Sequence, residues 1–326
     1  MIRRSIPLML IARIALIVAL MTATCGCEER PLCYDHSHKS PVNIEFDWSL
    51  APEAEPSTMV VWFFPVDGSA GHRYEIIGDG RSSRAGFNTS LNVPEGTYRM
   101  VCHNGNTDNN IERGHTLSDY EITTYEDNVL SGLSNRADNA PRPDDTESQP
   151  VRAQASTLYA HTHEQTIAIV ANAPKPYYVC FTPREVTYRC NVRITGVENL
   201  QPGLEASAII TGAAECWHAE TQEPGGALVT VPFPLAHCGS DCLTGTVILF
   251  GYNEPPADFY HKLRVYTSYK YYYDFDITDQ IHDAPDPYNI DVTVAGIKLP
   301  DNPAGGTGMA PGVSDWEDAE EEEIPM

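Results

Sequence analysis

Three cysteines lie close together near the amino end of the chain, in the stretch MTATCGCEERPLC at residues 21–33. Thiols at this spacing can close a short disulfide, bind a soft metal ion, or accept a covalent group. Which chemistry applies to Cys25, Cys27 and Cys33 depends on the segment before them and on the elements that follow.

The first residues have the pattern of a secretory signal. Arg3 and Arg4 give a positive amino end, and the apolar run that follows is interrupted only by Arg13. Its uninterrupted part, residues 14–21, is far shorter than the roughly 20 apolar residues that a membrane-spanning helix needs. Small residues then lead into the cysteines, as they do before a signal cleavage site. The pattern predicts that residues 1–26 are removed during export.

A cysteine at the predicted cleavage site resembles the end of a bacterial lipoprotein signal, in which a small residue precedes a cysteine whose thiol takes a diacylglycerol. Gly26 precedes Cys27, so the resemblance implies Cys27 as the lipid attachment point and first residue of the mature chain. Cys25, after Ala23 and Thr24, is the second choice, and an ordinary cleaved signal or an uncleaved anchor stays open. Two or more acyl chains anchor a protein stably.

The charge of the chain excludes two classes of partner. The formal net charge is −24, and loss of the signal removes three arginines and no acid, which makes it −27. An acidic surface of this size repels nucleic acid and anionic lipid headgroups. The sequence therefore predicts an extracytoplasmic protein that binds no nucleic acid.

Seven further cysteines follow Cys27, and an exported protein can oxidise them. An odd number leaves at least one of them unpaired. Cys238 and Cys242, in HCGSDC, are close enough in sequence to form a local disulfide, and the sequence does not determine the other pairings.

Beyond a polar tether at residues 27–41, the chain has the patterns of β-strands. Residues 42–48, VNIEFDW, alternate apolar and polar side chains, which is typical of a half-buried strand. Residues 59–66, MVVWFFPV, are continuously apolar, so we expect a strand that is covered on both faces. Polar loops around one or two weak strands are expected at residues 103–155.

A second set of strands begins at residues 186–194, where Val186, Cys190 and Val192 share one face. No long stretch has an apolar period of 3.6 residues. The sequence predicts an all-β protein with an N-terminal sandwich at 42–184 and a C-terminal sandwich at 185–300. Residues 301–326 form an acidic tail rich in Gly and Pro, which cannot bury enough apolar surface to order itself, although its part near 313–316 can add as a strand to a neighbour.

The order of these elements resembles that of a known family. The stretches that carry the resemblance are FDW in the first strand, VVWFFPVDG, VPEGTYRMVCHN, YRCNVRITGVENL, TVILFG and the tail GGTGMAPGVSDWED. Together they are similar to fimbrillin-like lipoproteins of Bacteroidales, in particular the anchor and accessory subunits of fimbriae and an uncharacterised branch of that group. The resemblance covers essentially the whole mature chain.

The resemblance implies two tandem transthyretin-like β-sandwich domains and a surface-exposed lipoprotein in the cell outer membrane. Glu28 and Glu29, directly after Cys27, resemble the signal that sends Bacteroidales lipoproteins to the outer face of that membrane. Fimbrial subunits of this kind join by strand addition, in which an extended segment completes a neighbour's sheet edge. Shaft subunits first lose an N-terminal strand to a protease at a basic residue. Arg81, Arg84 and Arg99 lie in or beside expected strands, which favours an anchor or accessory subunit over a shaft subunit.

Other constellations do not predict chemistry of their own. The pairs His36–His38 and His161–His163 lie in polar, loop-like chain without compact four-ligand spacing, so neither predicts a metal site. The stretch NGNTDNNIE at 104–112 is interpreted as a polar turn because it lacks the pattern of a calcium loop. Hydrolase, zinc-protease and phosphate-loop motifs are missing. We therefore predict a protein that is not an enzyme, with no catalytic residue and no cofactor.

A tyrosine-rich stretch, YTSYKYYYDF at 266–275, supplies the alternative function. One strand face is expected to carry Tyr269, Tyr271, Tyr273 and Phe275, and the other Tyr266 and Tyr272. Aromatic side chains pack well in sandwich cores, but an exposed pair also stacks on sugars. The sequence thus predicts a fimbrial anchor or accessory subunit with other fimbrial subunits as partners. The alternatives are a glycan-binding surface lipoprotein of a polysaccharide-uptake system that uses Tyr266 and Tyr272, or a surface protein with neither role.

Overall fold

The computed structural model describes residues 38–78, 87–134, 140–252, 260–300 and 317–318. Strands account for nearly all regular structure in these ranges, where the single helix is α2 (Thr278–His282). The predicted all-β fold is confirmed. No helix in these ranges is long and apolar enough to cross a membrane. The signal at 1–26, with Cys25 and Cys27, lies outside the described residues.

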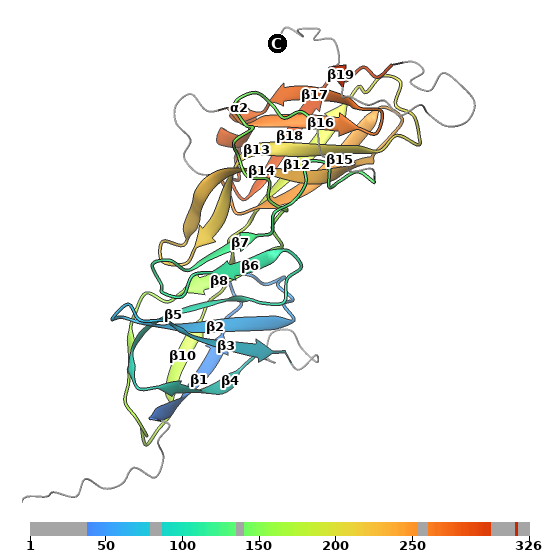
Figure 1. The fold of residues 1–326 in the computed structure, drawn as a ribbon. Coiled ribbons are helices and arrows are strands. Elements are labelled where there is room, and N and C mark those ends of the chain that lie inside the picture. Colours follow the sequence, from blue (N-terminus) through green and yellow to red (C-terminus); the bar gives the residue numbers. More distant parts are fainter. Residues whose placement is uncertain (1–37, 79–86, 135–139, 253–259, 301–316, 319–326) are drawn as a thin grey trace, which may run out of the picture. The chain divides into compact units, whose positions relative to one another are not determined.

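The N-terminal sandwich consists of two facing sheets (Figure 1). Sheet A has the order β10 (Tyr177–Phe181), β1 (Lys39–Phe46), β4 (Thr89–Pro94). Sheet B has the order β11 (Arg184–Glu185), β8 (Tyr159–Thr162), β5 (Gly96–Asn104), β2 (Thr58–Pro65), β3 (His72–Ile77), with β9 (Ile167–Ile169) also paired to β5. One apolar cluster fills the space between the sheets, because alternate side chains of β1 and β2 point into it.

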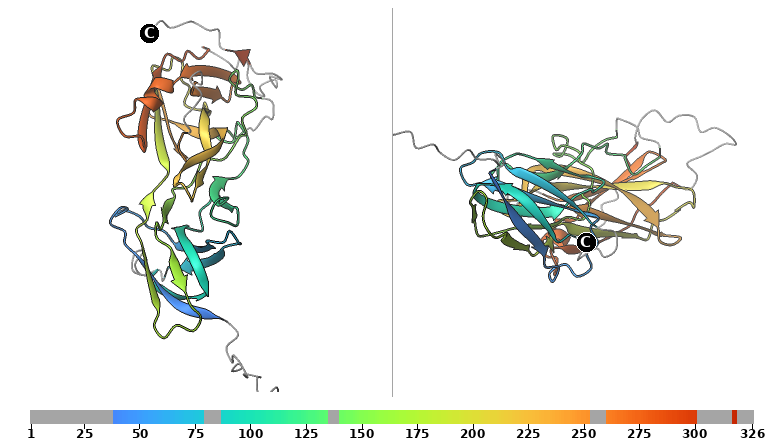
Figure 2. Two further views of the ribbon diagram at one scale, coloured as in Figure 1. Left: turned by 90° about the vertical axis from the view of Figure 1, so that its left-hand side faces the viewer. Right: turned by 90° about the horizontal axis from the view of Figure 1, so that it is seen from below.

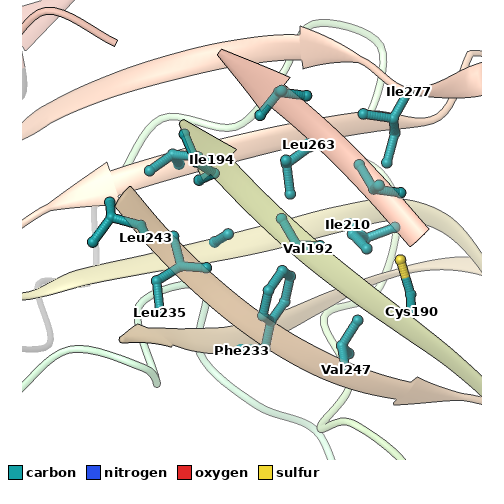
Figure 3. Close-up of a cluster of buried hydrophobic side chains, with 14 of the residues drawn as sticks. Cys190, Val192, Ile194, Ile210, Phe233, Leu235, Leu243, Val247, Leu263 and Ile277 are labelled. Carbon is teal, nitrogen blue, oxygen red and sulfur yellow. The ribbon is translucent and has the colours of Figure 1, made fainter. Parts of the chain in front are cut away.

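The C-terminal sandwich is built from one continuous series of paired strands. Its order is β18 (Asn289–Ala295), β12 (Tyr188–Thr195), β15 (Cys242–Leu249), β14 (Glu223–His237), β13 (Ala206–His218), β16 (Lys262–Thr267), β17 (Tyr271–Asp276), β19 (Glu317–Asp318). The long strand β14 pairs with β13 along most of its length and with β15 at its end, so it passes from one layer to the other. Figure 3 shows the core between the layers, with Val192, Ile210 and Phe233 directed into it.

A hairpin from within residues 42–184 joins the sheet of the C-terminal sandwich. Strands β6 (Asn110–Arg113) and β7 (Glu121–Thr124) pair with each other, and β7 also pairs with the end of β13, where Trp217 lies opposite Ile122. The sequence indicates weak strands here but not that they belong to the second sheet. The domain boundaries drawn from the sequence stay a prediction.

The chain between β7 and β8 lies along the C-terminal strands (Figure 2). Leu130 and Leu133 pack on Ile209 and Tyr266, and the backbone of Arg152 donates a hydrogen bond to the carbonyl of Thr230. The prediction of a polar turn at 104–112 is wrong for residues 110–112, which belong to β6, and the turn before them is held by this chain. The side-chain amides of Asn104, Asn109 and Asn110 donate to backbone carbonyls of residues 154–157. These polar side chains therefore hold residues 154–157, which have no regular secondary structure, against the turn.

Strand β2 is buried on both faces, as its continuous apolar sequence predicts. Met59, Val61 and Phe63 face the core between sheets A and B. Val60, Trp62 and Phe64 face the opposite way, into a second cluster that includes Tyr120, Trp217 and Phe250. Trp217 and Phe250 lie in the range predicted for the C-terminal sandwich, so this second cluster joins the two sandwiches.

A partly buried polar network lies beside this joint. The indole nitrogen of Trp62 and the hydroxyl of Tyr120 both donate to Oε2 of Glu112, at 3.0 and 2.9 Å. Arg73 pairs with Oε1 of the same carboxylate at 2.8 Å. Nε2 of His103 lies 2.7 Å from the Tyr120 hydroxyl, and its Nδ1 lies 2.9 Å from the carbonyl of Asn104. Burial is the main cause that lowers the pKa of His103, against the opposing effect of the Glu112 charge.

We expect Phe64→Ala to lower the free energy of unfolding by about 3–5 kcal/mol, because it removes a large ring from a packed core. The Phe64 ring is 1% exposed and stacks on Trp62 at 5.1 Å between centroids. Val66→Ala is the matched control, since Val66 follows the same strand and is 57% exposed. Urea unfolding measures both. Equal midpoints for the two variants would contradict the two-sided burial of β2.

Stability should also fall in mild acid because of His103. An unfolded histidine has a pKa of about 6.5, and the folded pKa of His103 lies below that value. Between the two values the unfolded chain binds more protons, so the free energy of unfolding decreases as the pH drops below about 6.5. The variant His103→Gln should show a shallower decrease in urea titrations from about pH 7.5 to 5. An unchanged slope would show that the pKa of His103 is the same in the folded and unfolded chains, and would contradict this prediction.

Candidate functional site

The first described strand, β1, occupies the centre of sheet A. It pairs in parallel with β10, where Ile44 lies opposite Val179, and antiparallel with β4, where Ile44 lies opposite Thr89. Val42 and Ile44 are fully buried. The chain that leads from the predicted lipid attachment point therefore enters the fold through a strand that is hydrogen-bonded on both sides.

Two hydrogen bonds of Ser40 connect the start of β1 to the loop after β9. Its hydroxyl donates to the carbonyl of Val170 at 2.6 Å and accepts from the backbone N–H of Ala173 at 2.8 Å. The Ser40 side chain is fully buried. Removal of β1 would therefore open a gap between β4 and β10 and leave buried partners without hydrogen bonds, which is costly.

The two outer strands of the C-terminal sheet are partly covered. β19 pairs in parallel with β17, with Glu317 opposite Tyr271. Beside β18, the side chain of Gln280 in α2 accepts a hydrogen bond from the backbone N–H of Thr293 at 2.8 Å. Both contacts reduce the number of backbone N–H and C=O groups that a new strand can reach at these edges.

Two outer strands of the N-terminal sandwich differ in their chemistry. β3 has a charged surface, because Arg73 pairs with Glu75 along it at 3.1 Å. β10 and β4 are the outer strands of sheet A, and neither carries a charged residue. Tyr178, in the middle of β10, is 69% exposed. Charges discourage pairing at a sheet edge, so β10 is a better acceptor for an added strand than β3.

The structure places the described cysteines in different environments. Cys238 and Cys242 form a disulfide, which closes the turn before β15. Cys102, Cys190 and Cys216 are buried thiols, whereas Cys180 is exposed on β10. Burial raises the pKa of Cys190 to about 12 and that of Cys102 well above its usual value, so both thiols stay protonated at neutral pH.

The tyrosine-rich strands have the predicted alternation but not the exposure that glycan binding requires. Tyr269, Tyr273 and Phe275 pack against the C-terminal core. Tyr266 lies on the opposite face and is fully buried, and its hydroxyl donates to the carbonyl of Pro141 at 2.6 Å. The assignment of Tyr266 as a glycan contact is therefore wrong, because the chain between β7 and β8 covers that face.

Tyr272, the other proposed glycan contact, has a packing role in the structure. The guanidinium of Arg264 lies 4.0 Å from the centre of its ring, a cation–π geometry. Asp274 pairs with this guanidinium at 2.5 Å, while the Arg264 side chain is only 5% exposed. Tyr272 thus covers a nearly buried charge, and the structure offers no concave pair of exposed Tyr266 and Tyr272 rings.

The histidine pair His161–His163 lies on one side of the chain, next to Phe181, with 5.9 Å between ring centres. The prediction of loop-like chain is wrong for His161, which belongs to β8. A different group of potential metal ligands comes together in the structure, namely Glu121, Cys216 and His218. The sequence analysis did not single out these three residues. The spacing Cys-x-His on an apolar strand was the available signal.

Comparison with known proteins places this fold among relatives. A model described as a domain of unknown function (DUF5119) matches residues 26–234. No curated protein matches the chain. Among solved structures, a candidate adhesin from Bacteroides ovatus has 17% identity and a TM-score of 0.56, over 92% of this chain and 99% of its own.

Two other solved structures are less similar. A second candidate adhesin from Bacteroides ovatus has 11% identity and a TM-score of 0.49, over 79% of this chain and 88% of its own. The fimbrial anchor protein Mfa2 from Porphyromonas gingivalis has 13% identity and a TM-score of 0.45, over 79% and 90%. The first of these structures shows that this chain shares the fold of a candidate adhesin, and the chain belongs to the family of the domain of unknown function DUF5119.

Proposed function

We propose that this chain is a surface-exposed, non-enzymatic lipoprotein that acts as an anchor or accessory subunit of a fimbrium. In this proposal Cys27 carries the lipid and holds the chain in the cell outer membrane. The observation that carries the proposal is the central position of β1 in sheet A, with paired strands on both sides. A subunit whose sheet is completed by its own N-terminal strand is suited to the end of an assembly.

The partner in this proposal is another fimbrial subunit, which joins by strand addition. A strand added to a sheet edge gains affinity from backbone hydrogen bonds and specificity from alternate side chains. β10 is the proposed acceptor edge, because it is uncharged and exposes Tyr178, whereas β17 and β18 are partly covered. The added strand would lie beside β10 and extend sheet A.

Metabolic labelling with a palmitate analogue tests the anchor. The wild-type protein and Cys25→Ala should carry the label, and Cys27→Ala should lose it, because only a thiol at the first mature residue accepts the lipid. Mass spectrometry of the amino end measures the acylated residue directly. Label on Cys27→Ala but not on Cys25→Ala would move the attachment point to Cys25, and an unlabelled wild type would overturn the lipoprotein proposal.

Co-purification from native membranes tests the acceptor edge. Tyr178→Lys places a charge on the exposed edge of β10 and should reduce the recovered fimbrial subunits several-fold, because charged side chains oppose strand addition. Ile77→Lys on β3 is the matched control, since Ile77 is 74% exposed on an outer strand of the opposite sheet. Equal recovery with both variants would exclude β10 as the acceptor. Recovery of no fimbrial subunit with the wild type would contradict the assembly role.

A further inference from the structure

Strand register brings three metal-binding side chains to one place at the end of β13. Cys216 and His218 are two residues apart on this strand, so they project from the same face of the sheet. β7 runs antiparallel beside them and places Glu121 opposite His218. Side chains opposite each other on neighbouring strands are close enough to bind the same ion.

One donor atom from each of the three side chains lies within 4.8 Å of the other two. Sγ of Cys216 lies 3.0 Å from Oε2 of Glu121 and 3.7 Å from Nε2 of His218. Oε2 of Glu121 lies 3.6 Å from Nδ1 of His218. Tetrahedral zinc with ordinary bond lengths separates sulfur, nitrogen and oxygen ligands by about 3.4–3.6 Å. Because one ion takes a single nitrogen of an imidazole, the carboxylate of Glu121 and the ring of His218 must rotate to surround such an ion.

Two glycines leave room beside the group. Gly225 is paired with Cys216 on the neighbouring strand β14. A Cβ atom at Gly225 would overlap the imidazole of His218, and one at Gly226 would lie 3.2 Å from Sγ of Cys216. Larger residues at either position would displace the His218 ring or crowd the Cys216 thiol.

The surroundings fix the carboxylate and leave an entry path. Arg113 donates from Nε to Oε1 of Glu121, which leaves Oε2 directed at the thiol. Hydrogen bonds of this kind orient ligating carboxylates in metal sites. Cys216 is fully buried, whereas the side chain of His218 is 34% exposed. Solvent therefore reaches the group from the side of the imidazole.

We propose that Glu121, Cys216 and His218 bind one Zn²⁺ ion. A thiolate, an imidazole and a carboxylate are the donor types that zinc prefers. The ion displaces the proton of the Cys216 thiol, which passes to solvent, and water takes the fourth position on the exposed side. The site is independent of the fimbrial proposal, since none of its three residues lies on β1 or β10.

A zinc ion here would join elements that otherwise share few hydrogen bonds. β7 and β13 pair over only two residue positions, Ile122 with Trp217 and Glu121 with His218. Glu121 belongs to the hairpin that leaves the N-terminal sandwich, and the other two ligands belong to the long central strand of the C-terminal sandwich. The ion would therefore hold the hairpin to the second sheet.

Metal titration of the mature protein tests the site. After treatment with a chelator, the wild type should bind Zn²⁺, and Co²⁺ used as a spectroscopic probe should give a thiolate-to-cobalt charge-transfer band. Cys216→Ser should abolish that band, and Cys216→Ser and His218→Ala should each weaken Zn²⁺ binding by more than about 100-fold, because loss of a ligand exceeds the effect of losing its hydrogen-bond partner. Cys190→Ser and His237→Ala are the controls and should keep wild-type affinity.

The result that overturns the proposal is a cobalt band that persists in Cys216→Ser, or no thiolate band in the wild type. Should Cys216→Ser fail to fold, X-ray absorption at the zinc edge of the loaded wild type decides the question. One sulfur at about 2.3 Å with nitrogen or oxygen neighbours supports the site. A shell without sulfur, or with more than one, refutes it.

Discussion

The two-sided burial of β2 is the constraint on which the rest of the fold depends. A strand with apolar side chains on both faces must be covered by two separate layers, and here one layer is sheet A and the other includes Trp217 and Phe250. The second layer forces the chain of residues 42–184 to remain in contact with the C-terminal sheet. The β6–β7 hairpin, its pairing with β13 and the partly buried network around Glu112 all lie at this contact.

Much of the strand pattern is predictable from sequence, because half-buried strands alternate and doubly buried strands are continuously apolar. β1, β2 and β12 follow these rules closely. The chain between β7 and β8 does not, since its few buried residues, such as Leu130 and Leu133, have no regular period and are buried by a distant strand. The same cover explains why Tyr266 has a favourable spacing for an exposed face and yet is buried.

Prediction of the candidate functional residues from sequence is limited for the same reason, since contacts between distant segments are not visible in it. Local spacing indicates the Cys238–Cys242 disulfide and the Cys-x-His pair at 216–218. Glu121 is far from that pair in sequence, and only the register of β7 against β13 brings its carboxylate to them. Register between strands depends on burial and on turns elsewhere in the chain. A single sequence therefore gives the ligand types but not the partner that completes the group.

The position of β1 has a mechanical consequence if the membrane holds its amino end. Tension along a strand acts across its hydrogen bonds to both neighbours at once, in shear, whereas tension on the end of a hairpin peels the bonds apart one by one. β1 is bonded to β4 and β10 over most of its length, and Ser40 adds two further bonds at the point where the load enters. Such an attachment loads the hydrogen bonds of the whole strand together, so β1 would resist extraction from sheet A.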